Sequence, residues 1–156
     1  MIEKTAAELS QALSSGELSS TELTQSYLDR ISRHNQELNA FITVCEESAL
    51  EQAKVADEKR ASGDKSPLLG IPLAHKDIFC TKGGITSCGS HMLEKFVAPY
   101  DATVVEKFKT AGAVMLGKTN LDEYTMGYSI ETRFFGPVKN YRELKRGTVG
   151  SSRLSA

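Results

Sequence analysis

The sequence predicts an α/β fold that begins with a mainly helical segment. In the first third of the 156 residues, apolar side chains recur at helical spacing, and capping-box patterns precede helical stretches. Two apolar runs farther along, 68–74 and 113–117, have the character of buried strands, and an amphipathic stretch, 103–112, lies between them. No internal repeat or linker is visible, so we expect one domain or part of one.

Two capping boxes predict the first two helices. Thr5 with Glu8, and Ser19 with Glu22, have the pattern in which each side chain can bond the other residue's backbone amide. Apolar residues follow the second box at helical spacing: Leu23, Tyr27, Leu28 and Ile31. We therefore expect a helix after each box.

A short strand and a third helix complete the first third of the chain. Residues 39–44 include Phe41, Ile42, Thr43 and Val44, a composition typical of a strand. Residues 43–46 offer a third capping box, for a helix through about residue 59. The alanines of this helix indicate close packing on a neighbouring element: Ala49, Ala53 and Ala56.

The rest of the chain alternates strand and helix before its pattern fades. The run 68–74 leads into residues 78–80, and together they are typical of a buried strand. The amphipathic helix 103–112 ends at a glycine, as helices often do, and the strand 113–117 follows. From Lys118 onward the sequence is polar and has no clear periodicity, so no further element is predicted.

Composition and charge argue against several classes of function. The chain has 25% charged and 40% hydrophobic residues, and its 19 basic and 20 acidic side chains give a net charge of -1. Such a balance provides no general attraction to nucleic acid or to an anionic membrane. No apolar run approaches the ~20 residues of a membrane span, and no signal peptide is expected. The three cysteines have no metal-ligand spacing, so we expect reduced thiols and a cytoplasmic location.

Three ionisable residues, His75, Lys76 and Asp77, interrupt the apolar run that begins at residue 68. Alternation along a strand would send Lys76 to one face and its two neighbours to the other. A lysine in an apolar setting binds its proton less tightly and can act as a base near neutral pH. The alternatives are a buried ion pair, or a lysine whose amine reaches the surface.

A second candidate is the serine-rich stretch Gly150-Ser151-Ser152. Serine in a glycine-flanked turn can present its hydroxyl and neighbouring amide hydrogens to a substrate, but exposed turns have the same composition. No histidine can be paired with a serine nucleophile by spacing. Residues 118–120 and the pair 126–127 would, by themselves, suit ordinary loops.

Taken together, several segments resemble the amidase signature family. Residues 69–77 are similar to its LxGIPxxxKD block. Residues 101–105 and 112–120 are similar to its DATVVxxLxxAGAxxxGKTNxDEF block, and 126–127 and 135–140 continue the match in order. The combination is highly specific and extends from the first helices to the last of these segments.

The resemblance implies a fold, a domain arrangement and a catalytic group. The family fold is a mixed β-sheet flanked by helices, and residues 1–156 would form a truncated amidase domain. Within it, residues 1–62 would be the mainly helical segment and residues 63–156 the start of the amidase core.

The family's catalytic group is a Ser-cis-Ser-Lys triad. Lys76 matches its lysine, which acts as the base, and Ser151 matches the serine that passes a proton between the lysine and the nucleophile. Met126, Gly127 and Ser152 match positions that bind substrate, and no metal is implied.

In the family the nucleophilic serine lies in a second glycine-rich segment, farther along than these 156 residues reach. We therefore expect the chain alone to be inactive, because it lacks the attacking atom and the oxyanion-hole amides. The chain also departs from the family's VPGGSSGGSA pattern, since Val149, Arg153 and Leu154 occupy glycine positions. Bulky or β-branched residues are poorly tolerated where a turn needs positive φ.

Within the family, the opening residues 5–31 and the stretch 126–140 are most similar to the A subunits of glutamyl-tRNA(Gln) amidotransferases. This similarity implies hydrolysis of glutamine, with the ammonia passed to a kinase-like partner subunit that activates glutamyl-tRNA. ATP and Mg²⁺ would bind in that complex and not in this chain. The other expected partners are tRNA, through the complex, and a small wrapping subunit, whereas no membrane is expected.

Two alternatives remain open at this level. In the first, the chain is the N-terminal part of another amidase-signature enzyme, one that hydrolyses small amides. In the second, it is a non-catalytic remnant whose helical first third binds a partner, although such a helical face is more often the inner face of its own domain.

Overall fold

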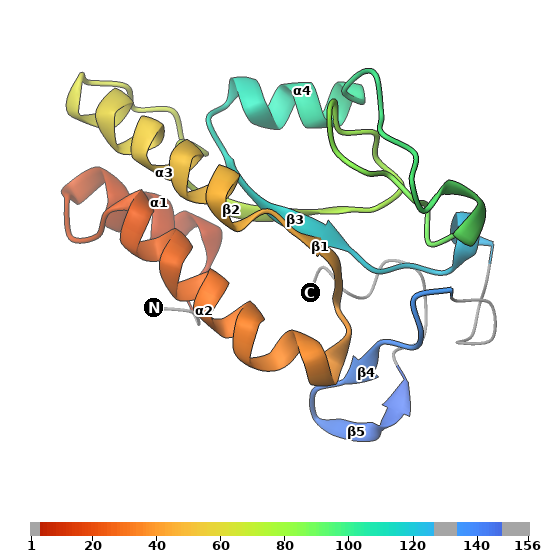
Figure 1. The fold of residues 1–156 in the computed structure, drawn as a ribbon. Helices are drawn as coiled ribbons and strands as arrows, with labels where there is room; N and C mark the ends of the chain where they lie inside the picture. Colours follow the sequence, from red (N-terminus) through yellow and green to blue (C-terminus); the bar gives the residue numbers. More distant parts are fainter. Residues whose placement is uncertain (1–3, 127–133, 148–156) are drawn as a thin grey trace. The chain divides into compact units, whose positions relative to one another are not determined.

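The computed structural model describes residues 4–126 and 134–147 and confirms the predicted α/β class (Figure 1). The helices are α1 (Ala6–Ser15), α2 (Ser20–Leu38), α3 (Glu46–Ala61) and α4 (Thr103–Thr110). The strands are β1 (Phe41–Val44), β2 (Pro72–Lys76), β3 (Val114–Thr119), β4 (Lys139–Asn140) and β5 (Glu143–Gly147). Short 3₁₀ turns occur at His91–Leu93 and Glu123–Thr125. None of these helices is long and apolar enough to cross a membrane.

The chain folds into two compact units. Unit 1 comprises Met1–Arg33, Cys45–Leu73 and Glu106–Leu116, and unit 2 comprises His34–Val44, Ala74–Val105 and Gly117–Ala156. The helix α2 and the strands β2 and β3 begin in unit 1 and end in unit 2. The division of the chain after residue 62 stays a prediction.

The N-terminal helices form as their capping boxes predict. The Thr5 amide donates to Glu8 Oε2 at 2.6 Å, and the Glu8 amide donates to Thr5 Oγ1 at 3.3 Å. The Ser19 amide donates to Glu22 Oε2 at 3.0 Å, and the Glu22 amide donates to Ser19 Oγ at 3.1 Å. The core behind these helices consists of buried Leu9, Leu13, Leu23 and Ile71, with Leu18 and Tyr27 packed against it.

The prediction of a third capping box, at Thr43 and Glu46, is wrong. Helix α3 begins at Glu46, and Cys45 at its N-cap position makes no side-chain capping bond. Thr43, the predicted cap, is instead a residue of β1 and pairs with Lys118 of β3, which holds it in the extended conformation. The alanines of α3 pack as expected: Ala49 and Ala53 are fully buried, and Ala56 is nearly so.

Strand β3 lies between β1 and β2 in a three-stranded sheet. Strand β1 runs antiparallel to β3, with Phe41 opposite Thr119 and a bulge before Thr43. Strand β2 runs parallel to β3, because the Val114 amide donates to the Ile71 carbonyl at one end and the Asp77 amide donates to the Thr119 carbonyl at the other. The sheet is therefore mixed.

The predicted strand 68–80 is too long, and the later part of the chain holds more structure than predicted. Strand β2 ends at Lys76, because the Phe79 amide donates to the Lys76 carbonyl and closes a turn. Strand β3 continues two residues past its predicted end, to Thr119, and the antiparallel pair β4 and β5 was not predicted. These elements depend on partners distant in the sequence, which local periodicity does not show.

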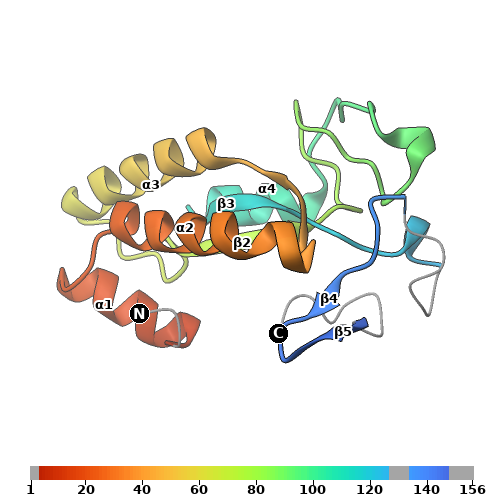
Figure 2. The ribbon, with the colours of Figure 1, turned by 60° about the horizontal axis from the view of Figure 1, so that its bottom comes forward.

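Asp57 of α3 accepts hydrogen bonds from the N-terminus of α2, and the two helices lie side by side (Figure 2). Asp57 Oδ1 accepts from the Ser20 amide at 2.7 Å, and Asp57 Oδ2 accepts from the Thr21 amide at 3.0 Å and from its hydroxyl at 2.8 Å. Backbone amides in the first turn of a helix have no intrahelical acceptor, so this carboxylate satisfies donors that the helix itself cannot.

We expect Asp57→Ala to lower the free energy of unfolding by about 1–2 kcal/mol, the usual effect of losing a cap. Urea denaturation followed by circular dichroism measures this change. The adjacent Glu58→Ala is the control, because Glu58 is exposed on the same helix. Equal stabilities of the two variants would contradict the role of Asp57.

Unit 2 exposes large apolar side chains between residues 79 and 100. They are Phe79, Ile85, Met92, Phe96, Val97 and Tyr100. Ile85 and Val97 form an isolated antiparallel bridge, so these two residues lie opposite one another. Exposed apolar groups gathered in one segment favour association.

We expect the 156-residue chain to self-associate through this segment, with a mean mass that rises with concentration in light scattering. The double variant Ile85→Thr/Val97→Thr is expected to shift the mass toward that of a monomer. A chain that stays monomeric at every concentration would show that these side chains do not drive association.

Candidate active site

The lysine predicted as a base lies at the C-terminal end of β2. Its neighbours His75 and Asp77 are buried, with 5% and 1% of their surface exposed, whereas Lys76 is only partly buried. This is the alternation expected of a strand. Lys76 therefore differs in environment from the two ionisable residues beside it.

Burial lowers the pKa of the Lys76 amine, and the negative charge of Asp122 acts in the opposite direction. Asp122 is itself fully buried and follows β3 in unit 2. A lysine whose charged form is disfavoured by burial has more of its neutral amine available near neutral pH. Such a group can accept a proton, as the sequence suggests for Lys76.

Directly after Lys76, a buried ion pair joins the end of β2 to β3. Lys118 Nζ lies 3.3 Å from Asp77 Oδ1, with 3% and 1% of the two side chains exposed. Lys118 Nζ also donates to the Phe79 carbonyl at 2.7 Å and to Thr86 Oγ1 at 3.1 Å. On the other side of the pair, Asp77 Oδ2 accepts from the Ser87 amide at 3.0 Å and from its hydroxyl at 2.5 Å.

Sequence reasoning missed Lys118 and its neighbour Asn120. Asn120 ties three segments of unit 2 together, because its side-chain amide donates to the Asn39 and Gly136 carbonyls and its Oδ1 accepts from the Leu121 amide. The residues after 117 were interpreted as an ordinary loop, although β3 continues through them. Two signals could have indicated the pair: Lys118 directly follows the apolar run 113–117, and Asp77 ends the run that begins at residue 68.

Among the other predicted site residues, the structure describes Met126. Met126 is 88% exposed and follows the 3₁₀ turn Glu123–Thr125, in which Tyr124 and Thr125 have positive φ. Gly127, Ser151 and Ser152 lie outside the described residues. Their assignments stay predictions from the resemblance.

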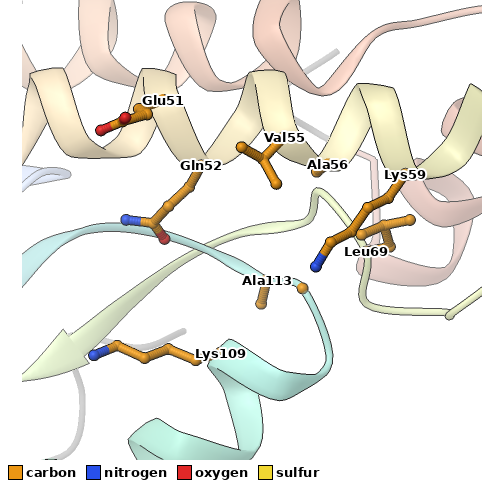
Figure 3. Close-up of a pocket in the computed structure, with 9 residues that line it drawn as sticks. Glu51, Gln52, Val55, Ala56, Lys59, Leu69, Lys109 and Ala113 are labelled. Atoms are coloured by element: carbon orange, nitrogen blue, oxygen red, sulfur yellow. The ribbon is translucent and has the colours of Figure 1, made fainter.

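Unit 1 contains a surface hollow of about 400 Å³ between α3 and the segment around Gly112 (Figure 3). Apolar side chains, among them Val55, Leu69 and Ala113, form much of its lining, and Lys59 and Lys109 also line it. Neither Lys76 nor Met126, the predicted site residues that the structure describes, lines this hollow. In the parts of the chain that the structure describes, no group of three or more His, Cys, Asp or Glu side chains could hold a metal ion.

Comparison with known proteins places these features in a family. The family model described as Amidase matches residues 22–153. The chain is 59% identical over all 156 residues to the A subunit of glutamyl-tRNA(Gln) amidotransferase from Thioalkalivibrio sulfidiphilus, and 61% identical to the protein of the same name from Nitrosococcus oceani. It spans 32% of the length of each of these relatives.

Solved structures have the same fold over this part of their chains. The native peptide amidase from Stenotrophomonas maltophilia is 36% identical with a TM-score of 0.87, and the match covers 98% of this chain and 33% of that one. A bacterial aryl acylamidase of the amidase signature family is 28% identical with a TM-score of 0.86, and the match covers 97% of this chain and 32% of that one. The predicted fold, the N-terminal part of the amidase-signature fold, is thereby confirmed.

We expect Asp122→Asn to lower the pKa of Lys76 further, because the Asp122 carboxylate favours the charged form of that lysine. The pH dependence of Lys76 acylation by acetic anhydride, followed by peptide mass spectrometry, measures this pKa. Asp101→Asn is the control, because it is the same substitution at an aspartate that bonds a different residue, the Lys82 amide, and the charged group that acts on Lys76 is Asp122. A pKa that rises or stays constant in Asp122→Asn would contradict the assignment of Asp122.

Proposed function

This chain belongs to the amidase family, and we propose that it is the N-terminal part of a serine-dependent glutamine amidohydrolase, the A subunit of a tRNA-dependent amidotransferase. One observation carries the proposal: identity of 55–61% to glutamyl-tRNA(Gln) amidotransferase A subunits over all 156 residues. The lowered pKa of Lys76, at the position of the family's lysine, supports the chemistry.

In the proposed reaction, a serine hydroxyl attacks the side-chain amide carbon of glutamine. Lys76 takes the proton of that hydroxyl through Ser151 and returns it to the departing ammonia, and water then hydrolyses the acyl-enzyme. Met126, Gly127 and Ser152 are proposed to contact the substrate. The attacking serine is not among the 156 residues, so we propose that this chain by itself does not hydrolyse amides.

The same proposal assigns the partners. The ammonia would pass to a kinase-like subunit, where ATP and Mg²⁺ support activation of glutamyl-tRNA, and a small wrapping subunit would hold the complex together. The role would be in cytoplasmic protein biosynthesis, as part of a ligase. Residues 112–119 match the G-x-x-x-x-G-K-[ST] pattern of a phosphate-binding loop, but Val114–Thr119 form strand β3 and Lys118 is paired with Asp77. This chain is therefore proposed to bind no nucleotide of its own.

A second candidate is an amidase that acts on small or peptide amides. The similarity to the peptide amidase, at 36% identity and a TM-score of 0.87, favours it. A third, a non-catalytic partner-binding role, would require only the helices of the first third. The substrates hydrolysed by a complete enzyme that carries these residues distinguish the first two.

The direct test is a fusion of these 156 residues to the rest of the Nitrosococcus oceani chain, produced with that organism's partner subunits. We expect ammonia release from glutamine, and Lys76→Met is expected to lower its rate by about 10²–10⁴-fold, the usual contribution of a general base. Lys82→Met is the control, because Lys82 is exposed in the same unit.

A second fusion, in which residues 147–156 also come from the relative, isolates the effect of Val149, Arg153 and Leu154. Activity only in the second fusion would place the defect in the serine-rich segment. Hydrolysis of peptide amides in preference to glutamine would favour the second candidate. Full activity of the Lys76→Met fusion would overturn the assignment of the base.

A further inference from the structure

We propose that Lys118 is a positioning residue that holds the turn after β2 and thereby fixes the amine of Lys76. The inference rests on the proposed function, in which Lys76 is the base, and it assigns a role to Lys118, which belongs to the GKTN segment of the family's second block but not to the triad. It stands on the contacts of the Lys118 ammonium with three different groups of unit 2.

The first set of contacts fixes the turn that follows Lys76. Within this turn the Phe79 amide donates to the Lys76 carbonyl at 3.0 Å, and Lys118 Nζ donates to the carbonyl of Phe79 at 2.7 Å. The next backbone amide after Lys76, that of Asp77, donates to the Thr119 carbonyl at 3.1 Å. Lys118 and Thr119, adjacent in β3, thus hold both sides of this turn.

The second set of contacts ties the turn to the segment 86–88. Lys118 Nζ donates to Thr86 Oγ1 at 3.1 Å, while its ion-pair partner Asp77 accepts from the amide and hydroxyl of Ser87. The Cys88 amide donates to the Asp77 carbonyl at 3.3 Å. Loss of the ammonium would therefore remove one hydrogen bond from each of the two segments at once, that to the Phe79 carbonyl and that to the Thr86 hydroxyl.

The ion pair is better explained by positioning than by stability. Desolvation of two charges offsets much of their attraction in a protein interior, and neutral replacements are often as stable. What the ammonium supplies is direction, because it can bond several acceptors while it faces a carboxylate. Lys118 Nζ donates to the Phe79 carbonyl and to Thr86 Oγ1, and its charge lies 3.3 Å from Asp77 Oδ1.

Removing Lys118 alone would leave the Asp77 carboxylate buried without its cation, so the test uses the neutral double variant Asp77→Asn/Lys118→Met. Acetic anhydride labelling of the 156-residue chain across pH, read by peptide mass spectrometry, reports the reactivity of each lysine. Asp122 is the charged group that acts on Lys76, and it is present in every variant. Lys82→Met is the matched control, the same substitution at an exposed lysine of unit 2.

We expect the reactivity of Lys76 near neutral pH to fall roughly three- to tenfold in the double variant, because a released turn admits water and its pKa returns toward the ordinary lysine value. The other lysines, and Lys76 in the control, are expected to react as in the unsubstituted chain. A folded double variant, judged by a cooperative unfolding transition, whose Lys76 profile is unchanged would overturn the proposal.

If the double variant does not fold, Thr86→Val decides. This substitution removes one acceptor of Lys118 and keeps the ion pair, so we expect a smaller fall in Lys76 reactivity. An unchanged Lys76 reactivity in this variant would overturn the proposal. The labelling needs no amidase activity. If the fusion enzyme is inactive but the Lys76 labelling profile still responds to these substitutions, the proposed function is contradicted and the positioning role of Lys118 is not.

Discussion

The buried ion pair between Lys118 and Asp77 is the interaction on which the arrangement around β2 and β3 depends. The two charges lie 3.3 Å apart with almost no exposed surface. Removing either one leaves the other buried and uncompensated, a change that typically destabilises a protein by about 3–5 kcal/mol. The turn after β2 and the segment 86–88 share this pair, so their geometries are coupled to each other.

Successive residues of β3 contact different parts of the structure: Gly117 lies against β1, whereas Lys118 and Thr119 contact Asp77. Gly117 allows β1 to approach, since a Cβ there would collide with the Thr43 carbonyl oxygen. Lys118 reaches Asp77 and the segment beyond it, and the Thr119 carbonyl accepts from the Asp77 amide. The requirement at Gly117 is one of space, so any side chain there would separate the strands.

Sequence reasoning succeeded where structure is local and failed where it depends on distant partners. The capping boxes at Thr5 and Ser19 were predicted correctly, because the bonds join residues three apart. The box at Thr43 was wrong because pairing with Lys118 in the sheet overrides it. Lys76 was noticed because charge in an apolar run is costly, but the partner of its neighbour lies 41 positions away, and only the sheet brings Asp77 and Lys118 together.

Two lysines on adjacent strands thus have opposite environments, and the difference bears on the chemistry. Asp77 is next to Lys76 in the sequence, and an uncompensated carboxylate there would favour the charged form of that lysine. Pairing with Lys118 balances this charge in the interior, while alternation directs Asp77 to the buried side and leaves Lys76 partly exposed. The pKa of Lys76 is then governed by burial, opposed by Asp122. A nearby carboxylate favours the charged form of a lysine, and pairing with Lys118 compensates the carboxylate that is adjacent to Lys76 in the sequence, so that Asp122 is the one that acts on Lys76.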